Sequence, residues 1–179
     1  MSMTVAPEQI DRIVWNQHHD PFEVLGPHLL EQNGKGSKWV VRAYLPNADA
    51  AWVILPEKRK EYPMQSVHHP HFFECTIETP ELANYQLRIK EGEHERVTYD
   101  PYAFRSPFLT DFDVHLFAEG NHHRIYEKLG AHLTEMNGVK GVYFAVWAPN
   151  ARNVSILGDF NHWDGRKHQM RKFGNGVWE

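Results

Sequence analysis

The chain contains an internal repeat of roughly a hundred residues. Residues 39–48 return as residues 142–151, which lie 103 positions later. Upstream, residues 24–28 return as residues 128–132 at a spacing of 104, so the loop between the matched segments differs by one residue. A match that continues through strand, turn and strand indicates a duplicated domain, because the repeats of solenoid proteins have much shorter periods.

The two copies differ in how far they extend. The first copy continues to about residue 104 through several more segments of strand character, whereas the second reaches only Glu179, the equivalent of Glu74. We therefore expect one complete domain followed by the start of a second. We also expect this chain to be the opening part of a longer polypeptide.

Composition excludes several classes of protein. A content of 41% hydrophobic and 23% charged residues is ordinary for a globular domain, and 179 residues suffice for one or two domains. A net charge of −4 argues against nucleic-acid or anionic-membrane partners. No apolar run approaches membrane-spanning length, and residues 1–8 lack the features of a secretory signal. The single cysteine, Cys75, forms no internal disulfide and favours a cytoplasmic location.

The pattern of residues predicts short strands after an opening helix. Residues 6–18 are expected to form the helix, with Thr4 near its start as a capping residue. Strands separated by turn formers predict an antiparallel β-sandwich. In the first copy the expected strands are 39–45, 52–55, 72–77, 85–90 and 96–99. In the second copy we expect a helical turn within 121–129, strands at 142–147 and 154–157, and a hairpin turn entering a third strand at 173–179.

The domain boundaries follow from this pattern. We expect a first β-sandwich module with its N-terminal helix at 1–110, a connector at 111–126 and the start of a second sandwich at 127–179. Asp111 and Asp113, within the connector, are spaced to share a face of an extended segment. They lack the nucleophile and acid geometry of glycoside chemistry and are expected to be solvated.

One strand of the second copy predicts a docking surface. Arg42 indicates that one face of the strand at 39–45 lies in water. The equivalent strand at 142–147 places Tyr143 and Trp147 on that face and is apolar on both faces. Because a sandwich strand normally has one face in water, we expect this outer face to contact another domain. A domain absent from this chain and the first sandwich are both candidates.

A turn near the end of the chain carries the most suggestive aromatic residue. Trp163 is flanked by Asn161, His162 and Asp164. The C–H face of a pyranose ring is apolar and can lie on an indole, while amide and carboxylate groups bind its hydroxyls. The turn is therefore a candidate sugar site.

Neighbouring residues have expected structural roles in that turn. We expect Gly158 to leave room for the turn, and Asp159 and Asn161 to bond its backbone. We expect Phe160 to close the end of the sandwich.

Other kinds of site receive no support. The 13 histidines include three adjacent pairs, but their spacing matches no zinc-binding set. No phosphate-binding glycine loop and no nucleophile triad is present. We expect no catalytic residue, no metal site and no cofactor in this chain.

Two segments carry a family resemblance. Residues 148–166 resemble the N-terminal sandwich of bacterial 1,4-α-glucan (glycogen) branching enzymes, members of the α-amylase superfamily, and residues 19–28 resemble the additional first module of many such enzymes. Residues 113–120 and 126–132 are also similar to that family. The resemblance covers nearly the whole chain. It implies an all-β fold of two tandem immunoglobulin-like (early-set) β-sandwiches with short N-terminal helices, the second incomplete.

The resemblance also implies a function. These enzymes transfer α-1,4-glucan segments to form the α-1,6 branches of glycogen in a (β/α)₈ barrel, which residues 1–179 are too short to include. We therefore expect no branching activity from this chain alone. The resemblance implies an α-1,4-glucan partner and an intramolecular barrel partner, with no nucleic acid or membrane partner, and we expect a monomer.

The resemblance suggests roles for particular residues. A tryptophan at the place of Trp163 stacks on glucan in related modules, and Asn161 and Asp164 would complete the contact. The opposing reading is that Trp163 and residues 164–171 pack on the barrel. Tyr143, Trp147 and Arg166 are the candidates for domain docking.

Three alternatives remain open. The chain could belong to a stand-alone glycan-binding protein, to the N-terminal part of a debranching enzyme or trehalohydrolase, or to a purely structural protein. The sequence that follows residue 179 in the gene would separate the first two from a branching enzyme, because each predicts a different continuation. Affinity for glycogen would separate them from a structural protein.

Overall fold

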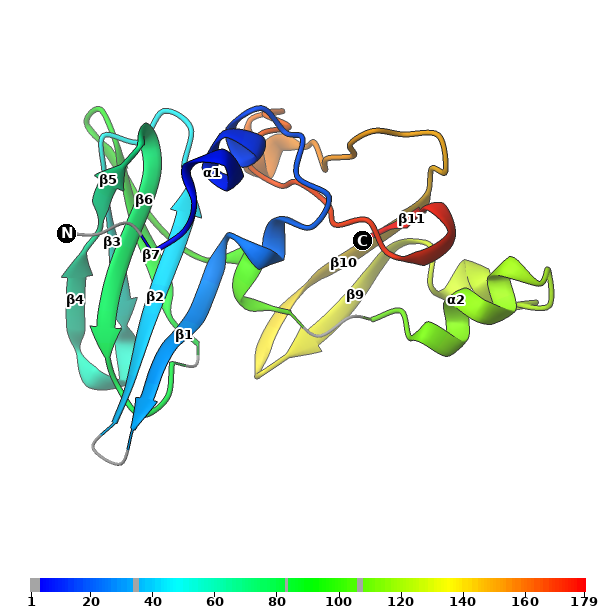
Figure 1. Ribbon diagram of the computed structural model, residues 1–179, viewed down its shortest axis with the longest axis horizontal. Helices are drawn as coiled ribbons and strands as arrows, with labels where there is room; N and C mark the ends of the chain where they lie inside the picture. Colours follow the sequence, from blue (N-terminus) through cyan, green and yellow to red (C-terminus); the bar gives the residue numbers. More distant parts are fainter. Residues whose placement is uncertain (1–3, 34–35, 83, 106–107) are drawn as a thin grey trace. The chain divides into compact units, whose positions relative to one another are not determined.

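The computed structural model describes residues 4–33, 36–82, 84–105 and 108–179 (Figure 1). The fold is mainly β-structure and divides into two compact units. Unit 1 comprises Met1–Asn16 and Pro21–Phe104, and unit 2 comprises Gln17–Asp20 and Arg105–Glu179. Among the described residues, no helix has the length and apolar character needed to cross a membrane.

Unit 1 is a sandwich of two antiparallel four-stranded sheets. The first sheet has the order β1 (Gly26–Asn33), β2 (Gly36–Tyr44), β6 (His69–Glu78), β5 (Gln65–Val67). The second has the order β4 (Lys60–Pro63), β3 (Ala50–Leu55), β7 (Gln86–Glu91), β8 (His94–Tyr99). Alternate residues of each strand point inward, and those of β2, β3, β6 and β7 form one continuous core. The predicted sandwich is confirmed.

The helix α1 (Pro7–Val14) covers the outer face of the first sheet (Figure 1). Its Ile10 and Ile13 are fully buried and pack in one cluster with Tyr44 of β2 and Phe72 of β6. Burial of this apolar face against the sheet stabilises the helix, since eight residues are too few for stability in isolation. The sheet therefore has protein on both faces.

The prediction that Arg42 marks a solvated face is wrong. Arg42 is only 4% exposed because α1 covers this face of β2. Its guanidinium donates hydrogen bonds to the Thr4 hydroxyl at 2.9 Å, the Thr4 carbonyl at 2.9 Å and the Val24 carbonyl at 3.2 Å. Thr4 also donates to the Glu74 carboxylate at 2.8 Å, whereas the N-cap of α1 is Ala6. Thr4 thus links a buried cation to a buried anion instead of capping the helix.

A second buried polar pair closes unit 1 at its C-terminal end. The Tyr85 hydroxyl donates to the carboxylate of Asp100, which is buried and also accepts from the Tyr102 amide at 2.9 Å. Tyr102 packs in turn against the start of β1. A Cβ atom on Gly26, where φ is +82°, would come within 2.9 Å of the Tyr102 carbonyl carbon. Only glycine fits this approach without a shift of the backbone.

In its described residues, the longer segment of unit 2 contains the helix α2 (Asp111–Ala118) and one three-stranded sheet. The sheet order is β11 (Val177–Trp178), β10 (Val139–Trp147), β9 (Gly130–Met136). Short 3₁₀ helices occur at Ile125–Glu127, Asp159–Asn161 and Gly174–Gly176. The segment 111–126, expected to be a connector, therefore contains α2 and the start of a 3₁₀ helix.

Two strand predictions for unit 2 had different outcomes. The strand expected near the end of the chain is confirmed as β11. The strand expected at 154–157 is reduced to a single bridge between Ser155 and Gln169. Its counterpart in unit 1, β3, lies between two other strands, and such a neighbour on the second side is missing from the described part of unit 2.

The duplication is confirmed by strand pairing. Gly26 lies opposite Arg42 in the β1–β2 pair, and Gly130 lies opposite Ala145 in the β9–β10 pair, which is the register that the repeat requires. The imidazole of His28 bonds the Leu25 carbonyl, and the repeat-related His132 bonds the Leu129 carbonyl at 2.9 Å. Each unit therefore starts with the same arrangement of helix, 3₁₀ turn and antiparallel strand pair.

The units differ at the inner face of that strand pair. In unit 1 the inward residues Val41 and Ala43 are buried in the sandwich core. In unit 2 the equivalent Val146 is exposed, and Leu133, on the same face, is 91% exposed. Among the residues that the structure describes, no second sheet covers this face.

Candidate functional site

The loop after the Ser155 bridge is built around the side chain of Asn161. This residue is only 1% exposed. Its Oδ1 accepts from the Gly158 amide at 3.0 Å, and its Nδ2 donates to the Ile156 carbonyl at 2.7 Å. A Cβ atom on Gly158 would lie 2.9 Å from Cδ1 of Phe160. The predictions hold for Gly158, which makes room for the turn, and for Asn161, which bonds its backbone. The Asp159 carboxylate instead accepts from the indole N–H of Trp163.

The loop presents the indole of Trp163 to solvent. His162 and Trp163 both have left-handed backbone conformations, with φ of +56° and +58°. Such a conformation is costly for a bulky residue, so the surrounding hydrogen bonds must impose it. Trp163 is 67% exposed, and its Nε1 donates to Asp159 Oδ1 at 2.9 Å. The indole is thus anchored at its polar edge while most of its surface remains accessible.

Asp164 is engaged by its neighbour Arg166. One carboxylate oxygen accepts from the Arg166 amide at 3.0 Å and from its Nε at 2.9 Å, and the other accepts from Nη2 at 2.8 Å. These hydrogen bonds from Arg166 lower the pKa of Asp164. The carboxylate is therefore an ionised acceptor held beside Trp163 in the sequence. Its predicted glucan contact, like that of Asn161, stays a prediction.

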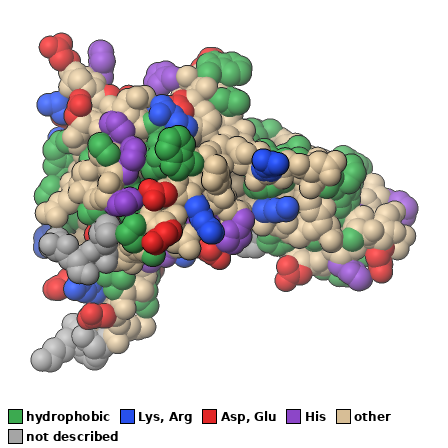
Figure 2. Space-filling model, turned by 45° about the horizontal axis from the view of Figure 1, so that its top comes forward, with side chains coloured by type: hydrophobic (Ala, Val, Ile, Leu, Met, Phe, Trp, Pro, Cys, Tyr) green, Lys and Arg blue, Asp and Glu red, His purple; other side chains and the backbone are tan. Residues whose placement is uncertain are grey.

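The prediction that Phe160 closes the end of the sandwich is wrong. Its ring is exposed and meets the His168 imidazole edge-on, with centroids 5.3 Å apart. The sandwich interior that Phe160 would close is not formed by the described residues of unit 2. Leu157, Phe160 and Trp163 are the exposed apolar side chains of this loop. Figure 2 colours hydrophobic side chains on the visible face of the molecule green.

All three predicted docking residues make contacts within unit 2, Arg166 through its hydrogen bonds to Asp164. The Tyr143 hydroxyl donates to Glu179, and its ring lies 4.7 Å from that of Phe108. Burial and the bond to Glu179 raise the pKa of Tyr143. Trp147 is more exposed: its indole N–H donates to the Asn175 carbonyl at 3.2 Å. The docking roles of Tyr143, Trp147 and Arg166 stay predictions.

Glu179 is the centre of a buried polar group that sequence reasoning missed. Its carboxylate accepts from Tyr143 and from Arg171, whose Nε lies 2.6 Å away. The side chain of Glu179 is almost fully buried. A signal was present, because Glu179 repeats the position of Glu74, but no sequence pattern singles out Arg171 as its partner.

The prediction that Asp113 is solvated in an extended linker is also wrong. Asp113 lies in the first turn of α2 and forms a capping box with Thr110. It also pairs with His122 at 3.0 Å and with Lys128 at 3.4 Å. Burial acts to raise the pKa of Asp113, but the hydrogen bonds from Thr110 and His122 outweigh it and the pKa is lowered. The spacing of Thr110 and Asp113 is a capping-box signature that could have predicted this helix start.

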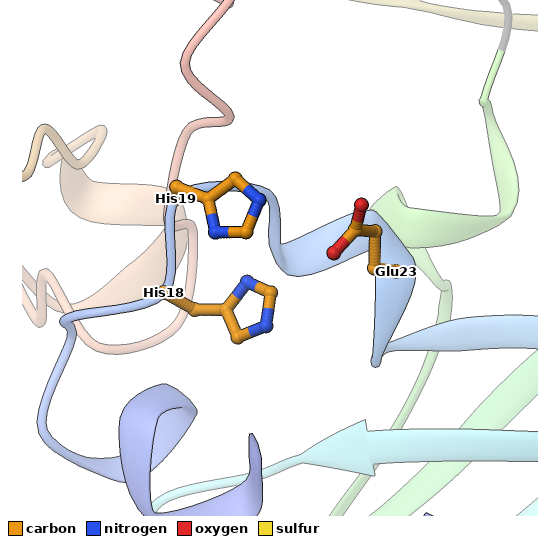
Figure 3. Close-up of side chains that lie close together, drawn as sticks. All are labelled: His18, His19 and Glu23. Carbon is orange, nitrogen blue, oxygen red and sulfur yellow. The ribbon is translucent and has the colours of Figure 1, made fainter.

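Figure 3 shows one of the adjacent histidine pairs, together with Glu23. The imidazoles of His18 and His19 stack with centroids 5.0 Å apart. His18 Nδ1 accepts a hydrogen bond from the Asp20 amide at 3.1 Å, and this bond stabilises the turn that follows α1. Both histidines belong to unit 2, whereas Glu23 belongs to unit 1.

Comparison with known proteins covers most of the chain. Residues 6–102 match the family model of the alpha-1,4-glucan branching enzyme GlgB N-terminal domain. Residues 128–179 match carbohydrate-binding module 48, the isoamylase N-terminal domain. Among solved structures, a mutant pullulanase from Paenibacillus barengoltzii complexed with maltotriose is 23% identical over 55% of this chain and 14% of that chain. Its TM-score of 0.34 is too low to support an argument about the fold.

Curated relatives are far more similar in sequence. The 1,4-alpha-glucan branching enzyme GlgB of Nostoc sp. (strain PCC 7120 / SAG 25.82 / UTEX 2576) is 82% identical across 100% of this chain and 23% of its own length. The protein of the same name from Trichormus variabilis is 81% identical across 98% of this chain and 23% of its own length. The chain thus spans about a quarter of the length of these relatives. Because the family model accounts for more than half of its residues, the chain belongs to the family of GlgB branching-enzyme N-terminal domains.

Proposed function

We propose that this chain is the non-catalytic N-terminal part of a 1,4-α-glucan branching enzyme that forms α-1,6 branches in glycogen. The family match and the names of the relatives support this proposal over a debranching enzyme or trehalohydrolase. The described residues form β-sheets and short helices, without the eightfold strand–helix alternation of a (β/α)₈ barrel. Cleavage and transfer of the glucan would therefore require parts of the relatives that lie outside the matched region.

The role proposed for this part is to hold an α-1,4-glucan chain. The observation that carries it is the exposed indole of Trp163, anchored to Asp159 at 2.9 Å. An indole fixed at its N–H edge can stack on the apolar face of a glucose ring without losing much conformational entropy on binding. Asp164 would accept a sugar hydroxyl, and Asn161 would act by holding the turn. Binding of a remote chain segment helps to position the bond that reacts.

A second proposed role is docking onto the remainder of the branching enzyme. Trp147 and Arg166 offer an exposed aromatic and a partly exposed cation, residue types enriched at the centres of interfaces. Tyr143 would contribute through packing, because its hydroxyl is engaged by Glu179. We further propose a monomeric, cytoplasmic protein. The single cysteine, Cys75, is a free thiol and supports this location, because the chain uses no internal disulfide.

Glucan affinity tests the proposed role of Trp163. The Trp163→Ala variant should bind glycogen about 5- to 10-fold more weakly in affinity electrophoresis, the loss expected for about 1–1.5 kcal/mol of stacking. Trp147→Ala is the matched control, since it removes another exposed indole of unit 2 and should leave glycogen affinity unchanged. Equal mobility of all three proteins in glycogen gels would overturn the proposal.

A further inference from the structure

The polar face of α1 carries a tryptophan that the core of unit 1 does not use. Ile10 and Ile13 face the sheet and are fully buried, whereas Asp11 and Arg12 face water. Trp15, directly after the helix, follows Asp11 by four residues and therefore lies on the same side. It is 71% exposed, more than Trp163. Most of its surface is accessible to solvent, and it is not among the side chains that pack in the cluster under α1.

The surroundings of Trp15 are fixed by hydrogen bonds. Its backbone N–H donates to the Asp11 carbonyl at 2.9 Å, and Asn16 then leaves the helix with φ of +53°. The Asp11 carboxylate pairs with His68 Nε2 at 2.9 Å. His68 lies between β5 and β6 and has a left-handed backbone with φ of +59°. The pair therefore joins α1 to the sheet and holds an acidic group one helical turn before the indole.

We infer that Trp15 and Asp11 form a second contact site for α-1,4-glucan, on unit 1. The indole would stack on a glucose ring, and the Asp11–His68 pair would bond its hydroxyls. A neutral polyol suits this combination, because the ring face is apolar while the hydroxyls can satisfy a partly exposed carboxylate and imidazole. Trp163 also follows an aspartate, Asp159, by four residues, but there the indole N–H donates to that carboxylate, whereas the Asp11 carboxylate pairs with His68. The choice of α-glucan as ligand rests on the proposed function.

Binding of maltoheptaose and glycogen to the whole chain tests the inference. In a ¹H–¹⁵N spectrum, the indole N–H signals of Trp15 and Trp163 should both shift as maltoheptaose is added. Trp15→Ala should weaken glycogen binding about threefold or more, and the double variant Trp15→Ala/Trp163→Ala should bind more weakly than either single variant. Asp11→Ala should weaken binding without moving the Trp163 signal. Phe112→Ala, which removes an exposed aromatic of α2, is the control and should bind normally.

The outcomes separate this inference from the proposed function. If Trp163→Ala loses affinity while Trp15→Ala binds as the parent and the Trp15 signal stays in place, the second site is refuted and the proposed function stands. If only Trp15→Ala loses affinity, the second site stands and the role of Trp163 is refuted. Absence of any glucan binding overturns both. Equal shifts with cellohexaose overturn the assignment of an α-glucan.

Discussion

The two units start alike and finish differently. Each has a helix, a 3₁₀ turn and an antiparallel strand pair in the same register. In unit 1 the inner face of that pair meets a second sheet, whereas in unit 2 the same face leaves Leu133 and Val146 exposed. The comparison teaches that local sequence is enough to set the strand register. In unit 1 the core is closed by strands that lie further along the chain, namely β3, β6 and β7.

In each unit a buried glutamate is bound by an arginine, but the arginine comes from a different part of the unit. Glu74 and Glu179 occupy equivalent positions, and both are buried. In unit 1 the cation is Arg42, directly opposite Glu74 on the neighbouring strand and linked to it through Thr4. In unit 2 that strand position holds Ala145, and Arg171 from a loop binds the carboxylate instead. The requirement for a buried partner is therefore common to both units, but its source is not.

Hydrogen exchange should give the largest difference between the units. Amides in β2 should exchange at least about a hundredfold more slowly than the equivalent amides in β10, because opening of an unsealed sheet costs much less free energy. Exchange of the intact chain, followed by NMR, measures both strands in one experiment. Similar protection of the two strands would show that unit 2 has a closed core in solution.

A longer chain sharpens the same test. Extending the protein with the residues that follow the matched region in the Nostoc relative tests whether they contain the counterpart of residues 75–104 of unit 1. Protection of β10 should then rise toward that of β2, while β2 itself stays unchanged. If the extension leaves β10 unprotected, the exposed inner face is not completed by the residues that follow.

Removal of the buried cations should have the next largest effect. Arg42→Met leaves Glu74 buried without its charge partner and should lower the free energy of unfolding of unit 1 by about 3–5 kcal/mol. Arg171→Met should lower that of unit 2 by about 1–3 kcal/mol, since one donor to Glu179, Tyr143, remains. Urea unfolding followed by resolved NMR signals measures each unit separately.

The matched control removes the buried charge as well. Arg171→Met combined with Glu179→Gln should recover part of the lost stability, because no uncompensated carboxylate is left. If the double variant is less stable than Arg171→Met alone, the arginine does not act through this carboxylate.

The sequence predicted features that repeat or that depend on local spacing. The duplication, the sandwich of unit 1 and the hydrogen bonds of Asn161 within its turn all follow from patterns visible in the residues. The burial of Arg42 could not be predicted, because it depends on α1 packing over a strand some thirty residues away. An arginine on a strand normally predicts that this face of the strand is exposed to solvent. Arg42 is buried only because α1 packs over it in the tertiary structure.

The candidate site was predicted only in part, because the sequence shows local patterns but not tertiary contacts. Composition placed Trp163 in a polar turn, but its anchoring by Asp159 requires the left-handed backbone at residues 162–163. Phe160 was expected to close the end of a sandwich, a role that depends on a second sheet and not on the turn itself. Phe160 is instead exposed, and among the described residues of unit 2 no second sheet lies over the β9–β10 pair.

Glycine substitution should have a moderate effect that again separates the units. Gly26 and Gly130 both have positive φ, of +82° and +106°. A Cβ atom would clash with the backbone of Tyr102 at Gly26, but at Gly130 it would make only an ordinary contact with His132, at 3.8 Å. Gly26→Ala should destabilise unit 1 by more than about 2 kcal/mol, because backbone strain adds to the clash with Tyr102. Gly130→Ala should destabilise unit 2 by about 1–2 kcal/mol, from strain alone. Equal losses would mean that the contact with Tyr102 relaxes without cost.

The smallest expected effect is a difference in pH response. Burial and the nearby His71 lower the pKa of His69 in unit 1 below its ordinary 6.5. The unfolded chain then binds a proton at a higher pH than the folded unit does, so the stability of unit 1 should decline as pH falls from about 6.5. In unit 2 the pKa of Asp113 is lowered from its ordinary 3.8, so its contribution persists above that pH and is lost only in stronger acid.

Unfolding of both units between pH 7 and 4.5 should therefore show a decline in unit 1 that His69→Gln reduces. Asp113→Asn is the reference. It should lower the stability of unit 2 by the same amount at every pH between 7 and 4.5, because Asp113 stays ionised over this range. His69 Nδ1 accepts the His71 amide at 3.2 Å, and protonation of that nitrogen would break the bond. A decline in unit 1 that is unchanged by His69→Gln would assign the pH response to other groups and remove this difference between the units.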